Sequence, residues 1–202
     1  KSAYKEGMVL GDIWGLQFDR FLTEDDFNAD GSLKAGLPDQ TKVFPAGYQF
    51  APGDVLYKDL DNNGEIVKQT NTNDKGDLSV IGNALPRLQF GLNLDAAWKG
   101  FDISMFFQGV AKRKLWAAGN QVLPGFTTGE PFYKGAEDYW TPENTDAFYP
   151  RPMDYKQSAS GNYSVNDRYL LNMAYLRLKT FTVGYSLPKV WLSKFKVQGL
   201  RV

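Results

Sequence analysis

The 202-residue sequence contains neither cysteine nor histidine, and its 23 basic and 23 acidic side chains leave no net charge. Without cysteine, a disulfide scaffold and a thiolate metal site are excluded. Thiol nucleophiles and histidine-based catalytic triads are excluded as well, so we do not expect an enzyme. The balanced charge provides no basic stripe of the kind that nucleic acids require, and we expect no nucleic-acid partner.

Long hydrophobic runs are also missing, since no stretch approaches the roughly 18 apolar residues of a transmembrane helix. A membrane role would therefore rest on strands, whose signal per segment is weaker. Aromatic residues, in contrast, make up 15% of the chain, and 20 glycines and 10 prolines interrupt it often. This mixture is typical of strands that are joined by turns and loops.

The most regular part of the sequence is a pair of segments in which apolar and polar residues alternate. Residues 87–98 give six consecutive matches to a period of two, which is the period of a strand. Lys99-Gly100 then supplies a two-residue turn, because glycine readily adopts positive φ. Residues 101–109 continue the alternation, with Phe106 as the one apolar side chain on the polar face. The pattern predicts a β-hairpin. Its apolar face would consist of Leu88, Phe90, Leu92, Leu94, Ala96, Trp98, Phe101, Ile103, Met105 and Phe107.

The length of these segments favours a membrane barrel. A strand of ~10 residues at ~3.3 Å each, tilted by ~45°, rises roughly 23 Å, which is about the height of the apolar band of an outer-membrane barrel. Trp98 and Phe101 flank the turn, where an aromatic girdle would lie. The alternative is a β-sandwich, in which a second sheet covers the same apolar face. Such a protein would be a secreted glycan-binding module.

A further strand is predicted within residues 169–187. The parity of its apolar positions changes between Leu178 and Phe181, which indicates a β-bulge or the point where the strand leaves the membrane. Residues 20–86 and 111–166 show no sustained period. We expect them to form long loops of the kind found on the extracellular side of large barrels.

Five sequence blocks follow one another along the chain. They are EGMVLGDIWGLQFD (residues 6–19), PGDVLYKDLDNNGEI (52–66), VIGNALPRLQFGLNLDAAWKGFDISMFFQGV (80–110), DYWTPENTDAFYPRP (138–152) and YLRLKTFTVGYSLP (175–188). Together they resemble the C-terminal barrel region of the SusC/RagA family of TonB-dependent outer-membrane transporters, which is characteristic of Bacteroidetes.

The resemblance implies an all-β fold, in which antiparallel strands form part of a large transmembrane β-barrel with long extracellular loops. Barrels of about 22 strands enclose a plug. Residues 1–202 are then expected to be the C-terminal part of a TonB-dependent receptor barrel, without the plug, the TonB box and the final strands. The family further implies a place in the lipid of the bacterial outer membrane and the import of nutrients such as oligosaccharides or peptides. A SusD-like surface lipoprotein is the expected partner, together with the TonB complex through N-terminal parts.

The acidic run of the second block resembles the opening of a calcium-binding loop, with oxygen ligands at alternate positions and Gly64 at the sharp turn. The twelfth position is Thr70 instead of glutamate, so the bidentate ligand is missing and a later aspartate would have to fold back. The predicted calcium ligands are Asp59, Asp61, Asn63 and Asp77. The alternative is a tight turn whose carboxylates accept hydrogen bonds from backbone amides.

Four aromatic residues of the long loops are predicted to contact cargo, because aromatic rings stack on the apolar faces of sugars. The alternative is that they pack the loops against one another, which long loops need in order to stay ordered. The four residues are Trp116, Tyr139, Trp140 and Tyr149.

Overall fold

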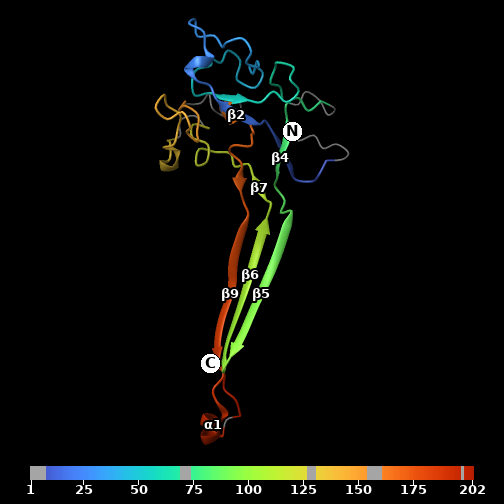
Figure 1. The fold of residues 1–202 in the computed structure, drawn as a ribbon, viewed down its shortest axis with the longest axis vertical. Coiled ribbons are helices and arrows are strands. Elements are labelled where there is room, and N and C mark those ends of the chain that lie inside the picture. Colours follow the sequence, from blue (N-terminus) through green and yellow to red (C-terminus); the bar gives the residue numbers. More distant parts are fainter. Residues whose placement is uncertain (1–7, 69–73, 127–130, 154–160, 197) are drawn as a thin grey trace. The chain divides into compact units, whose positions relative to one another are not determined.

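The computed structural model describes residues 8–68, 74–126, 131–153, 161–196 and 198–202, and Figure 1 shows its ribbon. The chain forms two compact units. The loop unit comprises Lys1–Leu85 and Lys114–Leu171, and the sheet unit comprises Pro86–Arg113 and Asn172–Val202. Among the described residues, no helix is long and apolar enough to span a membrane.

Strands make up most of the regular structure. The strands are β1 (Asp12–Gly15), β2 (Phe18–Phe21), β3 (Val55–Tyr57), β4 (Ser79–Asn83), β5 (Leu88–Trp98), β6 (Phe101–Ala111), β7 (Lys114–Leu115), β8 (Leu171–Asn172) and β9 (Tyr175–Tyr185). The pairs β1–β4, β2–β3, β5–β6 and β6–β9 are antiparallel. The helical segments are short: η1 (Glu24–Asp26), η2 (Lys134–Ala136), η4 (Gly161–Tyr163), α1 (Lys189–Leu192) and η5 (Ser193–Phe195). The predicted all-β, antiparallel class is confirmed, and the sheets of the described residues are open.

The sheet unit is built on β5, β6 and β9, which lie side by side in that order and have 11 residues each (Figure 1). Between β5 and β6, Lys99 and Gly100 both have positive φ, at 49° and 92°. Positive φ at both central residues defines the type I′ turn, whose twist matches that of the adjoining strands. The predicted hairpin is confirmed, and β6 extends two residues further than predicted, to Ala111.

The predicted β-bulge is confirmed in β9. The register between β6 and β9 shifts where Phe106 pairs with Thr180 and Phe107 pairs with Leu178, so Lys179 is the extra residue. An extra residue reverses the parity of all later side chains and keeps the apolar ones on one face. The strand is shorter than the predicted 169–187, because the Asn172 side chain accepts a hydrogen bond from the Ala174 amide and interrupts it.

The apolar side chains of the three strands share one face, as the cross-strand pairs Leu92–Phe107, Leu94–Met105 and Met105–Phe181 show. Much of this face is exposed. Its exposed members are Leu88, Phe90, Leu92, Leu94, Trp98, Phe101, Ile103, Leu176, Leu178, Phe181 and Val183.

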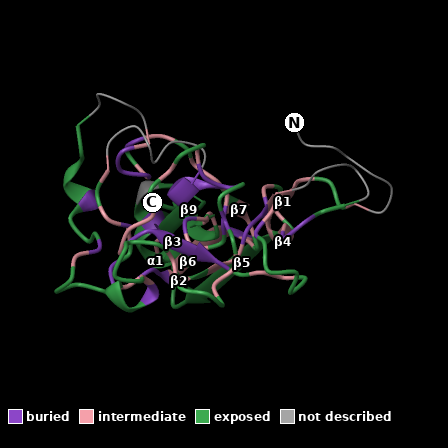
Figure 2. Ribbon diagram, turned by 90° about the horizontal axis from the view of Figure 1, so that it is seen from above, coloured by how far each residue is buried: buried purple, intermediate pink, exposed green. Residues whose placement is uncertain are grey.

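The loop unit contains short strands that the sequence does not reveal. Strand β1 pairs with β4 and β2 pairs with β3, in ladders of three to five residues. Residues 20–86 are therefore less irregular than predicted, since segments this short carry too few alternations to show a period. All of β3 is buried, as the purple ribbon in Figure 2 shows. It belongs to a core of Leu16, Phe21, Val43, Phe44, Val55, Tyr57, Ile66, Trp140 and Ala147.

A buried polar network joins distant loops of this unit. Asp54 is fully buried, and its carboxylate accepts hydrogen bonds from the Arg151 guanidinium at 2.9 and 3.2 Å. Tyr48 Oη and Asn162 Nδ2 each donate to Asp54 Oδ1 at 2.9 Å. A buried carboxylate is tolerated only when its oxygens are satisfied in this way. Burial, together with the charge of Asp54, raises the pKa of Tyr48 well above its usual value.

Candidate functional site

The first candidate site is the exposed apolar face of the sheet unit. Leu92 is 47% exposed and Leu94 is 43% exposed in the middle of β5, where a soluble protein buries such side chains. Isolated exposed leucines are ordinary, but a continuous patch over three strands marks a surface that meets an apolar partner. On the hairpin, seven large apolar side chains of this face are exposed: Leu88, Phe90, Leu92, Leu94, Trp98, Phe101 and Ile103.

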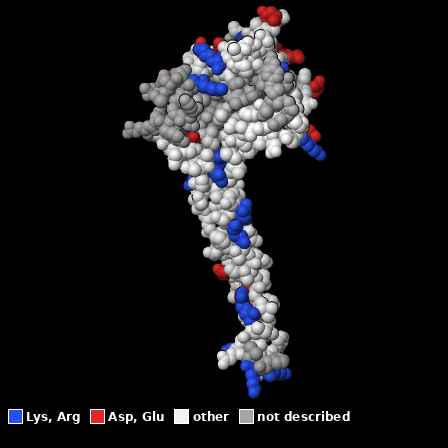
Figure 3. Space-filling model, turned by 180° about the vertical axis from the view of Figure 1, so that it is seen from behind, with Lys and Arg blue, Asp and Glu red and all other residues white. Residues whose placement is uncertain are grey.

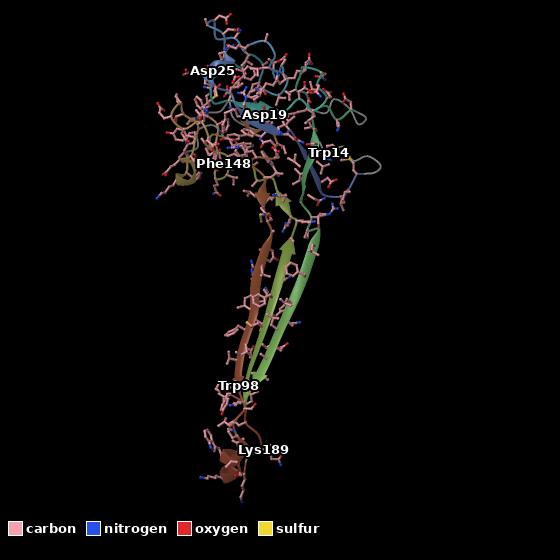
Figure 4. All side chains as sticks on the ribbon, in the orientation of Figure 1. Trp14, Asp19, Asp25, Trp98, Phe148 and Lys189 are labelled. Carbon is pink, nitrogen blue, oxygen red and sulfur yellow. The ribbon has the colours of Figure 1, made fainter. Side chains whose placement is uncertain are left out.

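Aromatic rings gather at the turn end of this face. The rings of Phe101 and Tyr185 lie 4.4 Å apart, and Lys99 Nζ lies 4.7 Å from the ring of Trp98. Figure 4 shows Trp98 at this end of the sheet, with Lys189 of α1 beyond it. Amphipathic aromatic rings of this kind favour the interface between hydrocarbon and water.

The opposite face of the sheet is polar and carries an ion pair near the turn. Arg201 and Asp102 of β6 form two charge-assisted hydrogen bonds across β9. The guanidinium passes over Gly184, at which an added Cβ would lie 2.5 Å from Arg201 Nη2. Glycine at this position therefore permits the contact. The C-terminal residues pair with the end of β9, since Val202 N donates to Tyr185 O and Tyr185 N donates to Val202 O.

The second candidate site is an acidic cluster in the loop unit. Carboxylate oxygens of Asp59, Asp61 and Asp77 lie within 4.8 Å of one another. Asp77 is fully buried, and its two oxygens accept hydrogen bonds from the amides of Leu60 and Val67 at 2.8 and 2.7 Å. The chain thus folds back at Asp77, as a metal loop would require.

One oxygen of this cluster has no visible partner. Asp59 Oδ2 accepts a hydrogen bond from Gly64 N at 2.7 Å, whereas the buried Oδ1 has none among the described residues. Partial loss of hydration and the neighbouring carboxylates of Asp59 and Asp77 raise the pKa of Asp61. A divalent cation would be coordinated by the unpartnered oxygen of Asp59, and its positive charge would reduce the repulsion among the three carboxylates.

The fourth predicted ligand is placed less favourably. Asn63 Oδ1 accepts a hydrogen bond from Glu65 N at 2.8 Å, and its Nδ2 donates to Asp61 at 3.0 Å. Glu65, which directly follows the glycine of the loop, pairs with Lys42. Thr70, the twelfth position of the loop motif, lies outside the described residues.

Three of the four aromatic candidates contribute to packing between loops. Trp140 is buried in the core of the loop unit, where its ring approaches Gly53 so closely that an added Cβ would lie 2.5 Å away. Tyr149 stacks on Tyr169 with the ring centroids 6.0 Å apart, and Trp116 packs against the same cluster. The second cluster consists of Leu123, Tyr163 and Tyr169, with Trp116, Val122, Phe126 and Tyr149 around it.

Tyr139 is the aromatic candidate with an exposed ring. It is 40% exposed and borders an open surface pocket of about 370 Å³. Exposed aromatic rings and one charge of each sign surround this pocket. Its lining consists of Phe132, Tyr133, Lys134, Ala136, Glu137, Tyr139 and Pro152.

Sequence reasoning missed several residues that shape the loops. Asp54 and Arg151 are 97 residues apart, and neither belongs to a periodic pattern that would pair them. Arg168 donates to the carbonyls of Ala147 and Phe148, and its guanidinium lies 4.3 Å from the ring of Phe18. Such cation–π contacts depend on the folded path of the chain and leave no signal in local sequence.

The comparisons with known proteins agree with the predicted resemblance. Over 204 residues, which cover 98% of this chain and 17% of the relative, it is 28% identical to TonB-dependent receptor P3 of Formosa agariphila. Over 145 residues, 70% of this chain and 13% of the relative, it is 34% identical to TonB-dependent receptor P26 of the same organism. The chain is thus related to a segment of TonB-dependent receptors, and it spans about a sixth of their length.

The chain is also similar to a solved structure, the RagAB peptide importer in its closed-closed state. The match covers 94% of this chain and 18% of the chain in that structure. The match has a TM-score of 0.47 and 15% sequence identity. No family model matches the chain. The predicted kinship with TonB-dependent receptors is confirmed, and the receptor names agree with the prediction that the chain is not an enzyme.

Proposed function

We propose that this chain forms part of the wall and the extracellular loops of a TonB-dependent transporter in the bacterial outer membrane. In this proposal residues 1–202 are the C-terminal part of the barrel, and strands β5, β6 and β9 cross the membrane side by side. The whole transporter imports nutrients such as oligosaccharides or peptides, together with a SusD-like lipoprotein and the TonB complex.

The observation that carries the proposal is the exposed apolar face of the three long strands. Each strand has 11 residues, and at ~3.3 Å per residue and a ~45° tilt it rises roughly 26 Å, the height of an outer-membrane apolar band. Leu92 and Leu94 then face lipid, while the alternating Asn93 and Asp95 face the wet interior. The β-sandwich alternative requires a second sheet over this face, and the described residues leave the face open.

Neighbouring residues of β5 allow a matched test in the full-length protein that contains this segment. We expect Leu92→Arg to destabilise the barrel by about 2–4 kcal/mol, the cost of an arginine on the lipid face near the bilayer midplane. Asn93→Arg places the same side chain one residue further, on the opposite face, and should be tolerated. The measurement is the amount of protein in outer membranes and its heat-modifiable migration on gels. Equal loss in both variants, or none in either, would contradict a lipid-facing strand.

We further propose that the acidic cluster holds a calcium ion. Asp59, Asp61 and Asp77 would provide carboxylate oxygens, with the unpartnered Asp59 Oδ1 as the atom best suited to a direct bond. The bound ion would supply positive charge that fixes the loop between Asp59 and Asp77. Because a bidentate acid is missing, we expect weak affinity, in the range of extracellular modules at about 10⁻⁴–10⁻³ M.

Calorimetry on the purified full-length protein tests this site directly. Asp59→Asn should abolish the calcium heat signal, whereas Asp30→Asn, an exposed carboxylate of another loop, should preserve it. Protection of residues 59–77 from proteolysis by calcium provides a second readout. The proposal fails if the wild-type protein gives no heat signal at millimolar calcium.

We propose that the pocket around Tyr139 contacts cargo, since its exposed rings offer flat apolar faces and Lys134 and Glu137 offer hydrogen-bonding groups. Tyr139→Ala should weaken growth on the cognate nutrient, and Tyr139→Phe, which keeps the ring, should not. Trp116 and Tyr149 would act indirectly by ordering the loops, and so would the buried Trp140. Unchanged growth of Tyr139→Ala would contradict a cargo contact at this pocket.

A further inference from the structure

The turn end of the sheet unit combines exposed apolar side chains with a concentration of positive charge. After β9, the chain forms α1 and η5, and this segment lies at the same end as the hairpin turn, since Ser186 N donates to Gly100 O at 2.7 Å. Within α1, Leu192 is buried, whereas Val190 is 75% exposed and Trp191 is 60% exposed. The four-residue helix α1 thus buries Leu192 and leaves Val190 and Trp191 exposed.

Lysines surround these two side chains. Lys189, Lys194 and Lys196 are all exposed, and no carboxylate within the described part of the chain pairs with them. Figure 3 shows blue side chains without red ones at this end of the sheet. Lys99 of the turn adds a fourth ammonium group. Arg201 is also near, but Asp102 neutralises it.

The sheet unit as a whole is basic, and five of its ten basic side chains lie at the turn end: Lys99, Lys189, Lys194, Lys196 and Arg201. Its residues 86–113 and 172–202 include ten basic and two acidic side chains, an excess of eight positive charges in a protein with no net charge. A surface that exposes Trp and Val side chains among lysines fits an apolar layer edged by negative charge. The headgroup region of anionic phospholipid has both properties.

We propose that Lys189–Lys196 is a lipid-binding segment that rests on the inner leaflet of the outer membrane and selects anionic phospholipid headgroups. Val190 and Trp191 enter the boundary between headgroups and acyl chains, and the three lysines bind lipid phosphates. This inference rests on the proposed barrel, because only a membrane-spanning sheet brings the turn end to that leaflet.

The test uses the full-length protein in nanodiscs of phosphatidylglycerol and phosphatidylcholine in equal amounts. Native mass spectrometry after partial delipidation gives the ratio of the two lipids that stay bound. We expect phosphatidylglycerol to be enriched on the wild-type protein. The triple variant Lys189→Gln, Lys194→Gln, Lys196→Gln should lower this enrichment at least about fivefold, the contribution of a single surface lysine.

Two further variants separate charge at this site from charge in general. The triple Lys34→Gln, Lys58→Gln, Lys75→Gln removes three exposed lysines of the loop unit and should leave the enrichment unchanged. The triple Lys→Arg variant at 189, 194 and 196 keeps the charge and should retain it. Heat-modifiable migration, measured on each sample, reports barrel assembly independently.

Equal enrichment in the wild-type protein and the Lys189–Lys196 glutamine variant, with normal migration, would overturn the lipid inference and leave the barrel proposal standing. A periplasmic protein would then be the better occupant of this end. Absence of heat-modifiable migration in the wild-type protein would refute the barrel proposal and this inference with it.

Discussion

The loop unit and the sheet unit divide one balanced composition in opposite ways. The sheet unit has an excess of eight basic side chains, so the loop unit, with thirteen basic and twenty-one acidic residues, has an equal excess of negative charge. The loop unit buries its large apolar side chains in two clusters. The sheet unit exposes its own along three strands. A composition averaged over the chain therefore conceals two environments.

The difference concerns where each unit obtains its stability. The loop unit obtains it from contacts within the unit, because its apolar side chains form two buried clusters and the buried Asp54 finds its partners there. In the sheet unit, ladder hydrogen bonds join β5, β6 and β9, but the apolar face of these strands is exposed. In the proposed barrel, further strands would complete the ladder and lipid would cover this face. Substitutions that damage one unit and spare the other are therefore the sharpest probes.

The largest effect within the loop unit is expected for Asp54→Asn. The amide keeps the shape but removes the negative charge, so Arg151 loses its buried counter-charge. An NH2 group in place of Oδ2 also leaves Arg151 Nη2 and the Ala51 amide without their acceptor. Breaking a buried pair by removing one partner costs about 3–5 kcal/mol. Arg151 retains some solvent access, so we expect about 3 kcal/mol. Urea-dependent proteolysis of the loops in the full-length protein measures it.

The exposed Asp30 serves as the control, since Asp30→Asn should change loop stability by less than about 1 kcal/mol. Heat-modifiable migration should stay normal in both variants. Loss of barrel migration in Asp54→Asn would show that the two units do not derive their stability separately.

A comparable effect is expected for Gly53→Ala. Gly53 has φ of 89°, and an added Cβ would meet the buried ring of Trp140 at 2.5 Å and Arg151 Cβ at 2.8 Å. The left-handed backbone costs roughly 1–2 kcal/mol for alanine, and overpacking adds about 1–3 kcal/mol. Gly36→Ala is the matched control, because Gly36 has φ of 99° and no atom within 4 Å of an added Cβ. If both variants lose equal stability in the proteolysis assay, the close contact with Trp140 carries no energy.

The three long strands of the sheet unit could be predicted from the sequence almost residue by residue. Their information is local, because a period of two fixes which face each side chain takes and Lys99-Gly100 fixes the turn. Even the bulge at Lys179 follows from the change of parity between Leu178 and Phe181. The sequence did not reveal that β9 begins only at Tyr175, next to a hydrogen bond of Asn172. It did not reveal the helical segments α1 and η5 either.

The loop unit could be predicted only in part, because its structure rests on contacts between distant residues. The acidic motif pointed to Asp59, Asp61 and Asp77, and the structure brings these three together. The role of Trp140 could not be read from its neighbours, since burial depends on Gly53, 87 residues away, making room for the ring. The partnership of Asp54 with Arg151 and Asn162 likewise had no local pattern.

The smallest predicted effect concerns acid stability of the loop unit. Asp26 accepts hydrogen bonds from both terminal nitrogens of Arg20, at 2.5 and 2.7 Å, and from Thr23 N at 2.8 Å. These contacts, led by the Arg20 hydrogen bonds, lower the pKa of Asp26 to about 2. Since the pKa of the unfolded chain is about 3.9, folding favours the ionised form. The stabilisation is complete above about pH 4 and disappears as the pH falls through about 2. Arg20 is half exposed, so screening keeps the effect near or below about 1 kcal/mol.

This effect can be measured by loop proteolysis in urea, with the wild-type protein and Asp26→Asn compared from pH 5 to pH 2.5. The comparison isolates the contribution of Asp26, because all other carboxylates are the same in both proteins. The difference between the two should shrink with falling pH, and a constant difference would mean that the Arg20 pair does not set the acid stability of the loops.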